Sequence, residues 1–271
     1  MNKKISIITV NYNDKVGLEK TIISVINQNS NDYEYIVIDG GSNDGSKEVI
    51  EKYKDKIDYW VSEPDKGVYN AMNKGIKVAK GEFVIFMNGG DSFYDETVLE
   101  NVNELLVDDF DIYYGDNYKI KQNSKRKKTY PEELTFSFFY TSCINHQSTF
   151  IRRKLFFDYF LYNEDFKIVS DWEFFIYTIC HENIPYKYLG ITISNYDFTG
   201  ISSIKKYRDV AHEEKMQVFN KYFPLFLEDY KKVAEIKSKR IQQVLYIKKF
   251  KFPWKIFKGI INFLTIFSFK K

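Results

Sequence analysis

Short apolar runs alternate with helical segments in the first third of the chain, and this alternation leaves few folds open to it. The run Lys4–Val10, KISIITV, is continuous and rich in β-branched residues, which is typical of a strand covered on both faces. The next segment, Asn13–Gln28, carries apolar residues at helical spacing behind Asn13 or Asp14 as the capping residue. The alternation continues with predicted strands at Tyr33–Gly41, Ile57–Glu63 and Glu82–Asn88 and predicted helices at Ser42–Asp55 and Gly67–Lys80. Helices between short apolar strands predict an α/β fold, a Rossmann-like and mainly parallel sheet with helices on both faces.

The pattern loosens after Asp91. The predicted elements are a helix at Asp95–Asp108, two strands within Phe110–Ile120 that turn at Gly115–Asp116, a basic loop at Lys121–Leu134, a strand and short helix at His146–Phe156, a helix at Ser170–Cys180 and a strand at Ile184–Phe198. Residues 204–247 are predicted to be helical and amphipathic. We therefore expect one domain over residues 1–203 and a helical C-terminal extension over residues 204–271.

Composition indicates a packed protein and gives no sign of nucleic-acid binding. Hydrophobic residues make up 44% and charged residues 28% of the chain, so a core is feasible and disorder is not expected. Aromatic residues reach 18%, and core packing explains them better than sugar or base stacking. The net charge of +3 does not imply a nucleic acid as partner. Cys143 and Cys180 lie far apart without metal-ligand spacing, which suits a reduced, cytoplasmic environment.

Acidic residues follow the predicted strands at the edge where open parallel sheets bind their ligands. Asp39 and Asp91 are flush with two strand ends and lie beside glycines, where a ligand could approach the backbone. Asn43 and Asp44 have a simpler explanation, because they can cap the following helix.

Neither a GxGxxG fingerprint nor a GxxxxGK[ST] phosphate loop is present, which excludes two common nucleotide sites. An isolated acid after a glycine pair instead suits Mg²⁺, which takes one or two protein carboxylates and completes its shell with water and phosphate oxygens. The sequence thus predicts a divalent cation, Mg²⁺ or Mn²⁺, at Asp91, with Gly89 and Gly90 leaving room for a diphosphate.

Four segments together resemble a known family. They read ITVNYN, VIDGGSNDGS, EPDKGVYNAMNKG and GEFVIFMNGGD, and they resemble the family 2 glycosyltransferases. The third segment, Glu63–Gly75, is similar to the EPDxGIYDAMNKG signature of a bacterial polysaccharide-building subgroup. The likeness is strong over residues 4–95 and patchy over about residues 140–200. It implies the GT-A fold and an inverting transfer of sugar from a nucleotide-diphosphate sugar.

The resemblance also implies roles for matching residues on the donor side. Asp39 would accept a hydrogen bond from a uracil-type base, which favours a UDP-sugar. The donor-binding set carried over from the family is Thr9, Asn11, Asp39, Asp65, Lys66 and Gln147. Asp91 would be the last acid of the metal-binding DXD element, although this chain has Asn88, Gly89 and Gly90 where many relatives have further acids.

Inverting transfer needs a base that removes a proton from the acceptor hydroxyl. Asp171 in IVSDWEFF is the first candidate, with Glu173 as the alternative; Asp171 could also serve only as a first-turn helix residue, and Glu173 could point to solvent. His146 resembles the histidine of the family's H-Q segment, beside the donor sugar and the acceptor entrance. Arg152 and Arg153 could contact phosphates, but a surface role is favoured for both.

The C-terminal segment Tyr246–Lys271 alternates lysine with aromatic and aliphatic residues. This pattern predicts an interfacial helix on anionic lipid, with a helix docked on the protein's own core or on another protomer as the alternatives. The N-terminal stretch is too short for a signal peptide, and no apolar run reaches the ~18 residues needed to span a bilayer. We expect a cytoplasmic enzyme, peripheral on the inner face of the membrane, with a saccharide or lipid-linked saccharide as acceptor.

Two other functions compete with sugar transfer. A non-catalytic nucleotide-sugar or glycan-binding module could keep the same fold, and the sparse metal element gives that reading some support. A nucleotidyltransferase is the third reading, but the chain lacks an early glycine-rich phosphate loop.

Overall fold

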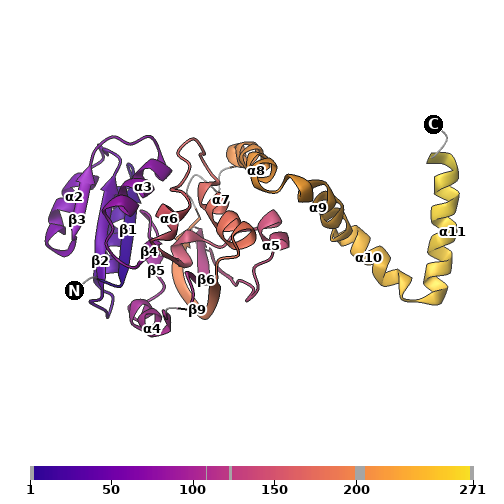
Figure 1. Ribbon diagram of the computed structural model, residues 1–271, viewed down its shortest axis with the longest axis horizontal. Helices are drawn as coiled ribbons and strands as arrows, with labels where there is room; N and C mark the ends of the chain where they lie inside the picture. Colours follow the sequence, from indigo (N-terminus) through magenta and orange to yellow (C-terminus); the bar gives the residue numbers. More distant parts are fainter. Residues whose placement is uncertain (1–2, 108, 122–123, 199–204, 269–271) are drawn as a thin grey trace. The chain divides into compact units, whose positions relative to one another are not determined.

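The computed structural model describes residues 3–107, 109–121, 124–198 and 205–268 (Figure 1). The chain divides into two compact units, Met1–Val218 and Phe219–Lys271. The domain boundary predicted at residues 203–204 lies outside the described residues.

A nine-stranded mixed sheet forms the centre of the first unit, in the order β3-β2-β1-β4-β8-β6-β9-β5, with β7 paired to β6. The strands are β1 (Ile5–Asn11), β2 (Tyr33–Asp39), β3 (Tyr59–Ser62), β4 (Phe83–Phe86), β5 (Ser92–Phe93), β6 (Ile112–Lys121), β7 (Ser124–Lys128), β8 (Thr149–Arg152) and β9 (Tyr186–Asp197). The first four are mutually parallel, as is the pair β6 and β9, whereas β8, β7 and β5 run antiparallel to their neighbours. Since β1, β2 and β3 are in register, Asn11, Asp39 and Ser62 lie side by side at the carboxyl edge.

Helices cover both faces of this sheet. The α-helices of the first unit are α1 (Lys15–Ile26), α2 (Ser46–Lys52), α3 (Val68–Val78), α4 (Val98–Leu105), α5 (Phe136–Thr141), α6 (Leu155–Asp158) and α7 (Ser170–Ile176), and α8 (Arg208–Tyr222) crosses the boundary between the units. Apolar residues of α1, α2 and α4 pack with Ile5 and Ile7 of β1 in one buried cluster. On the opposite face, α3 approaches so closely that a Cβ at Gly75 would lie 2.5 Å from the Ile8 side chain.

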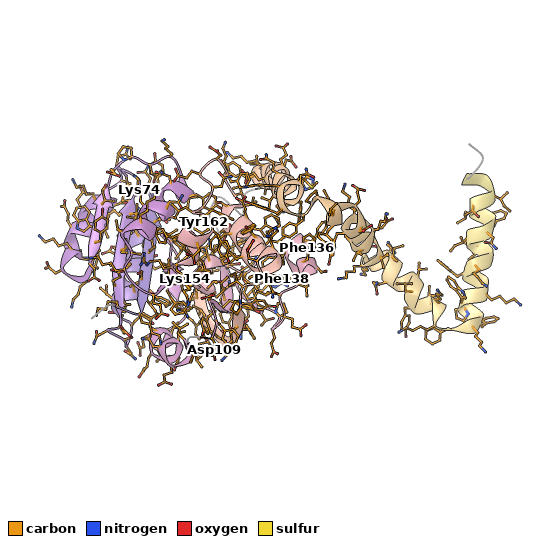
Figure 2. All side chains as sticks on the ribbon, in the orientation of Figure 1. Lys74, Asp109, Phe136, Phe138, Lys154 and Tyr162 are labelled. Carbon is orange, nitrogen blue, oxygen red and sulfur yellow. The ribbon has the colours of Figure 1, made fainter. Side chains whose placement is uncertain are left out.

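On this second face, a buried aromatic cluster joins α3, β4 and α7. Tyr162, labelled in Figure 2, is 2% exposed and its ring packs against Tyr69 of α3, Phe86 of β4 and Phe174 of α7. The cluster therefore fixes α3 and α7 relative to the end of β4, where several predicted site residues lie.

The predicted fold class is confirmed, but two local predictions are wrong. No turn occurs at Gly115–Asp116, because β6 runs continuously through it with a shift of register against β9. Gly115 instead permits a close approach, since a Cβ there would lie 2.6 Å from the carbonyl oxygen of Ile191. The predicted basic loop contains β7, which forms a hairpin with β6. The predicted helix Ser170–Cys180 is α7 followed by a π-helical turn, Tyr177–His181.

The second unit is helical, with α9 (Pro224–Ile236), α10 (Lys239–Lys248) and α11 (Lys251–Ser268). Together with α8, these helices confirm the predicted C-terminal run of helices. Within the described ranges, every helix is too short or too polar to cross a lipid bilayer.

Candidate active site

Asp39, at the end of β2, is fully buried and accepts four hydrogen bonds from protein donors. They come from Asn11 Nδ2 at 2.8 Å, Ser42 N at 2.9 Å, Ser42 Oγ at 2.6 Å and Ser62 Oγ at 2.7 Å. Burial acts to raise the pKa of Asp39, but these hydrogen bonds outweigh it and leave the pKa below its ordinary value. The parallel register places Asn11 and Ser62 here, and Ser42 follows β2 directly, so the cluster is a product of the sheet.

The other residues predicted to bind the donor have varied surroundings. Asp65 lies next to Gly40, where a Cβ would be 2.5 Å from its carboxylate, whereas Lys66 is exposed. Thr9 is fully buried, and its hydroxyl donates to the Met87 carbonyl at 2.7 Å, between neighbouring strands. Tyr12, not singled out from the sequence, is 66% exposed with its ring beside Gly40. Its position two residues after a predicted strand end was the available signal.

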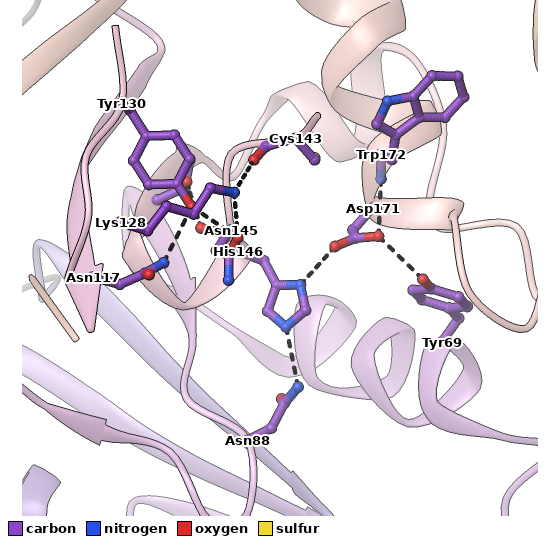
Figure 3. Close-up of polar contacts among 11 residues, drawn as sticks. Tyr69, Asn88, Asn117, Lys128, Tyr130, Cys143, Asn145, His146, Asp171 and Trp172 are labelled. Atoms are coloured by element: carbon purple, nitrogen blue, oxygen red, sulfur yellow. Dashed lines mark hydrogen bonds and ion pairs between the residues drawn. The ribbon is translucent and has the colours of Figure 1, made fainter. Parts of the chain in front are cut away.

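A second polar cluster joins the end of β4 to the start of α7 (Figure 3). His146 Nδ1 lies 2.8 Å from Asp171 Oδ2, and Asn88 Nδ2 lies 3.1 Å from His146 Nε2. Tyr69 donates its hydroxyl to Asp171 Oδ1 at 3.1 Å. Sequence reasoning named His146 and Asp171 but gave no role to Tyr69, which lies inside the EPDKGVYNAMNKG segment.

The start of α7 holds Asp171 in place. Its Oδ1 accepts the amide of Trp172 at 2.9 Å, and Glu214 accepts the amides of Lys167, Ile168 and Val169 just before the helix. Burial acts to raise the pKa of Asp171, but the hydrogen bond and charge of His146 and the other donors lower it below its ordinary value. The side chains of Asp171 and His146 retain 18% and 15% exposure, so both can be reached from outside.

Asp91 differs from Asp39 and Asp171 in that its surroundings raise its pKa above the ordinary value. It is 3% exposed, its Oδ1 accepts the amide of Asp197 at 2.8 Å, and Gln147 also donates to it. Burial raises the pKa of Asp91 to about 7 against the effect of these donors. The alternative that Glu173 points to solvent is wrong, because Glu173 is 1% exposed.

These surroundings fit a sparsely coordinated cation rather than a protein cage. Among the described residues, no group of three or more histidine, cysteine, aspartate or glutamate side chains could hold a metal. Asp91 is nevertheless a carboxylate whose negative charge burial disfavours, next to the glycine pair Gly89–Gly90. Such a group can contribute one ligand to Mg²⁺ or Mn²⁺ when phosphate oxygens supply others.

The two polar clusters share one edge of the sheet. A Cβ at Gly89 would lie 2.8 Å from Asn11 Oδ1, and the neighbouring Asn88 contacts His146. The Asp39 and Asp171 clusters are thereby connected through the ends of β1 and β4. Arg152 and Arg153 are not part of this edge: Arg152 pairs with Asp111, and Arg153 donates to Gly81 O, before β4 begins. The surface role favoured for both is not borne out, because the Arg152 side chain is only 13% exposed and Arg153 is partly buried.

Comparisons with known proteins identify the class. A mixed, mostly parallel α/β sheet with polar strand ends is the GT-A architecture, and TarS of S. aureus in complex with UDP-GlcNAc shares it with a TM-score of 0.64 at 20% identity, over 80% of this chain and 67% of that chain. The full TarS chain gives a TM-score of 0.61 at 21% identity, and the match covers 90% of this chain but 47% of TarS. PcManGT from Pyrobaculum calidifontis, a mannosyltransferase in complex with GDP-Man and Mn²⁺, gives 0.60 at 14% identity over 82% of this chain and 64% of that one.

The model of the family described as "Glycosyl transferase family 2" matches residues 6–165, more than half of the chain. The chain therefore belongs to glycosyl transferase family 2, which confirms the resemblance at the level of the family.

Curated relatives lie in the same class. A "PGL/p-HBAD biosynthesis glycosyltransferase" of Mycobacterium bovis is 27% identical over 73% of this chain and 78% of its own length. A "Cholesterol galactosyltransferase" of Borreliella burgdorferi is 36% identical over 47% of this chain and 37% of its own length.

Proposed function

We propose that this protein is an inverting, metal-assisted glycosyltransferase that moves a sugar from a UDP-sugar to a saccharide acceptor, lipid-linked, in the synthesis of a cell-surface polysaccharide. The observation that carries the proposal is the His146–Asp171 pair, partly exposed on the same sheet edge as the Asp39 cluster. A binding module would not need a carboxylate held by three donors and still open to solvent.

Asp171 is the proposed base. Its oxygens are oriented by His146, Tyr69 and the Trp172 amide, which leaves lone pairs for an acceptor hydroxyl. As the acceptor oxygen bonds to the anomeric carbon, its proton passes to Asp171 and the bond from that carbon to the diphosphate oxygen breaks. One in-line displacement inverts the configuration. His146 holds the carboxylate and stabilises its negative charge until the proton arrives.

The donor is proposed to lie along the ends of β1, β2 and β4. The Asp39 cluster would bind the base, and the exposed ring of Tyr12 offers it a stacking surface. Asp65 and Lys66 are proposed at the sugar-diphosphate side, and Gln147 positions Asp91. A divalent cation at Asp91 would neutralise charge on the departing diphosphate. TarS and PcManGT were solved with UDP-GlcNAc and with GDP-Man and Mn²⁺, which supports a nucleotide-sugar donor here.

The C-terminal helices are proposed to hold the enzyme on an anionic membrane surface, where a lipid-linked acceptor would be available. In α11, Lys251, Lys255 and Lys258 share one face by helical spacing, and the exposed Ile256 and Ile260 share the opposite one. This arrangement is typical of an interfacial helix.

The test is the release of nucleoside diphosphate. The protein is incubated with a panel of UDP- and GDP-sugars and Mn²⁺, alone and with saccharide acceptors, and the wild type is compared with Asp171→Asn. We expect release from at least one donor, increased by an acceptor and lost in the variant. Donor binding without release in either protein would favour the non-catalytic module.

A further inference from the structure

The β6–β7 hairpin carries basic residues on both faces. Cross-strand pairs define the faces: Lys119 lies opposite Arg126, Lys121 opposite Ser124, and Lys128 opposite Asn117. Since alternate residues of a strand point to opposite sides, these pairs lie on one side of the ribbon. We call the four cations Lys119, Lys121, Arg126 and Lys128 the basic face.

The positive charges of the basic face are not neutralised by carboxylates of the described chain. In the part of the chain that the structure describes, none of its four cations forms an ion pair with a carboxylate, whereas Lys127 on the other face pairs with Asp116 at 3.2 Å. Like charges directly opposite each other, as at Lys119 and Arg126, destabilise a two-stranded ribbon.

Repulsion between neighbouring cations also contributes to the pKa values of two of these lysines, after the larger effect of burial. Burial and then the charge of Arg126 lower the pKa of Lys119. Burial lowers the pKa of Lys128 to about 8, and the charge of Lys119 adds to this effect. Lys119 is therefore repelled by Arg126 and in turn repels Lys128, and a bound anion would relieve this repulsion.

Two contacts connect the basic face to the candidate active site. Lys128 Nζ donates to Cys143 O at 2.8 Å and approaches Asn145 Oδ1 at 3.4 Å, and His146 is the next residue (Figure 3). At the other contact, Lys119 lies 4.5 Å from the ring centroid of Phe198, which follows Asp197, the partner of Asp91. The basic face thus borders the segments that hold His146 and Asp91.

We infer that the basic face binds the anionic group, phosphate or carboxylate, of a saccharide acceptor whose hydroxyl is presented to Asp171. The inference rests on the proposed function, which it deepens by giving the acceptor a charge. A lysine-rich edge strand can also serve only to prevent pairing with other chains. That role would depend on both faces of β7 equally, so the two faces can be compared.

Arg126 and Lys125 provide the matched pair. They are adjacent and exposed on β7, but Arg126 belongs to the basic face and Lys125 lies over the Tyr118 ring on the other face. Binding of maltose 1-phosphate, digalacturonate and neutral maltose is measured by calorimetry with the full chain, with saturating UDP and Mn²⁺ to fill the donor side. Comparison of the two anionic sugars separates a phosphate from a carboxylate preference.

We expect at least one anionic sugar to bind more tightly than maltose, and Arg126→Glu to weaken that binding about tenfold or more, as for the loss of a hydrogen bond to a charged group. Lys125→Glu should change it less than about twofold, through screened charge alone. Arg126→Glu also places opposite charges at residues 119 and 126, so its melting temperature should not fall. If the melting temperature of Arg126→Glu is unchanged, a loss of sugar binding in this variant is not caused by a loss of folding.

Several outcomes would overturn the inference. The first is that Arg126→Glu and Lys125→Glu weaken the binding of the anionic sugar equally. The second is that maltose binds as tightly as the anionic sugars, and the third is that no anionic sugar binds even at low ionic strength. Binding of an anionic sugar that occurs without UDP but is lost at saturating UDP would overturn it as well, because the face would then belong to the donor side. The proposed function is contradicted by a different result, namely that the wild type releases no nucleoside diphosphate from any donor. The effect of Arg126→Glu on sugar binding can still be measured in that case.

Discussion

Asp171 is held by donors from three separate places in the chain. His146 holds one oxygen, and Tyr69 and the Trp172 amide hold the other. Each donor favours the ionised form, so the carboxylate stays charged despite burial. A low pKa makes a weaker base, but it keeps nearly all of the enzyme in the proton-accepting state at neutral pH.

Tyr69→Phe should therefore shift the pH profile more than the rate at neutral pH. Removal of the hydroxyl donor raises the pKa of Asp171, and activity of a base is lost as pH falls through its pKa. We expect the acidic limb of the kcat/KM profile to move to higher pH in this variant.

Tyr162→Phe is the matched control for this prediction. Tyr162 packs against Tyr69, but its buried hydroxyl has no hydrogen-bond partner within the described structure. Its removal should leave the acidic limb in place. Equal shifts in both variants would contradict a specific role for the Tyr69 hydroxyl.

The ionisation of Asp91 should make the stability of the folded protein depend on pH. Its pKa is about 7 in the folded protein and near 3.9 in an unfolded chain, so the folded state binds the extra proton between these values. Stability is therefore lost as pH rises through this window. Asp91→Asn removes the charge, and without metal it should raise the free energy of unfolding at pH 8 by about 2–4 kcal/mol relative to the wild type.

Urea denaturation at several pH values checks this prediction. The difference between Asp91→Asn and the wild type should shrink as the pH falls to about 4 and below, where Asp91 is protonated in the folded protein and increasingly so in the unfolded chain. A difference that is independent of pH would show that ionisation of Asp91 is not its cause.

At the scale of the elements, the sequence predicts most of the first half of the sheet. Buried parallel strands leave continuous apolar runs such as that of β1, and the helices between them leave a helical period. The end of β2 then follows, and with it the position of Asp39. The prediction that Asp91 is flush with a strand end is wrong, because β4 ends at Phe86 and Asp91 directly precedes β5. The contact between His146 and Asp171 was not predictable from spacing, because it depends on how η2 (His146–Ser148) and α7 pack.

The errors have a common physical origin in β6. A glycine followed by aspartate is a local turn signal, but here a tertiary contact decides the conformation. Gly115 lies against the Ile191 carbonyl of β9, and the strand continues past it with a shifted register. Likewise the lysines of β7 are polar enough to predict a loop, yet cross-strand hydrogen bonding to β6 makes them a strand.

Gly115→Ala tests this account of β6. A Cβ would lie 2.6 Å from a backbone oxygen, which cannot move as a flexible side chain can. We expect a loss of about 1–3 kcal/mol in the free energy of unfolding, the usual range for overpacking, measured by thermal or urea denaturation. An unchanged stability would mean that β6 and β9 do not approach each other here as described.

At the scale of the whole molecule, charge is distributed unevenly along the chain. The net charge is +3 over 271 residues, yet ten lysine and arginine residues and no acids follow Ile236. Each cation near an anionic bilayer contributes about 1 kcal/mol of attraction, which salt screens. Apolar insertion should add to this attraction, and the two contributions can be separated on α11.

We predict that the full chain sediments with vesicles containing phosphatidylglycerol but not with pure phosphatidylcholine, and that Ile256→Glu/Ile260→Glu abolishes this binding. Asn262→Glu/Thr265→Glu adds the same negative charge near the lysine face of α11, so it should weaken binding only partly.

If α11 instead packs on the protein's own core, the isoleucine variant should lower the melting temperature without lipid. If it contacts another protomer, that variant should change the sedimentation coefficient. Retained vesicle binding in the isoleucine variant would contradict insertion of the apolar face, and donor hydrolysis unaffected by either pair would show that anchoring is separate from the chemistry.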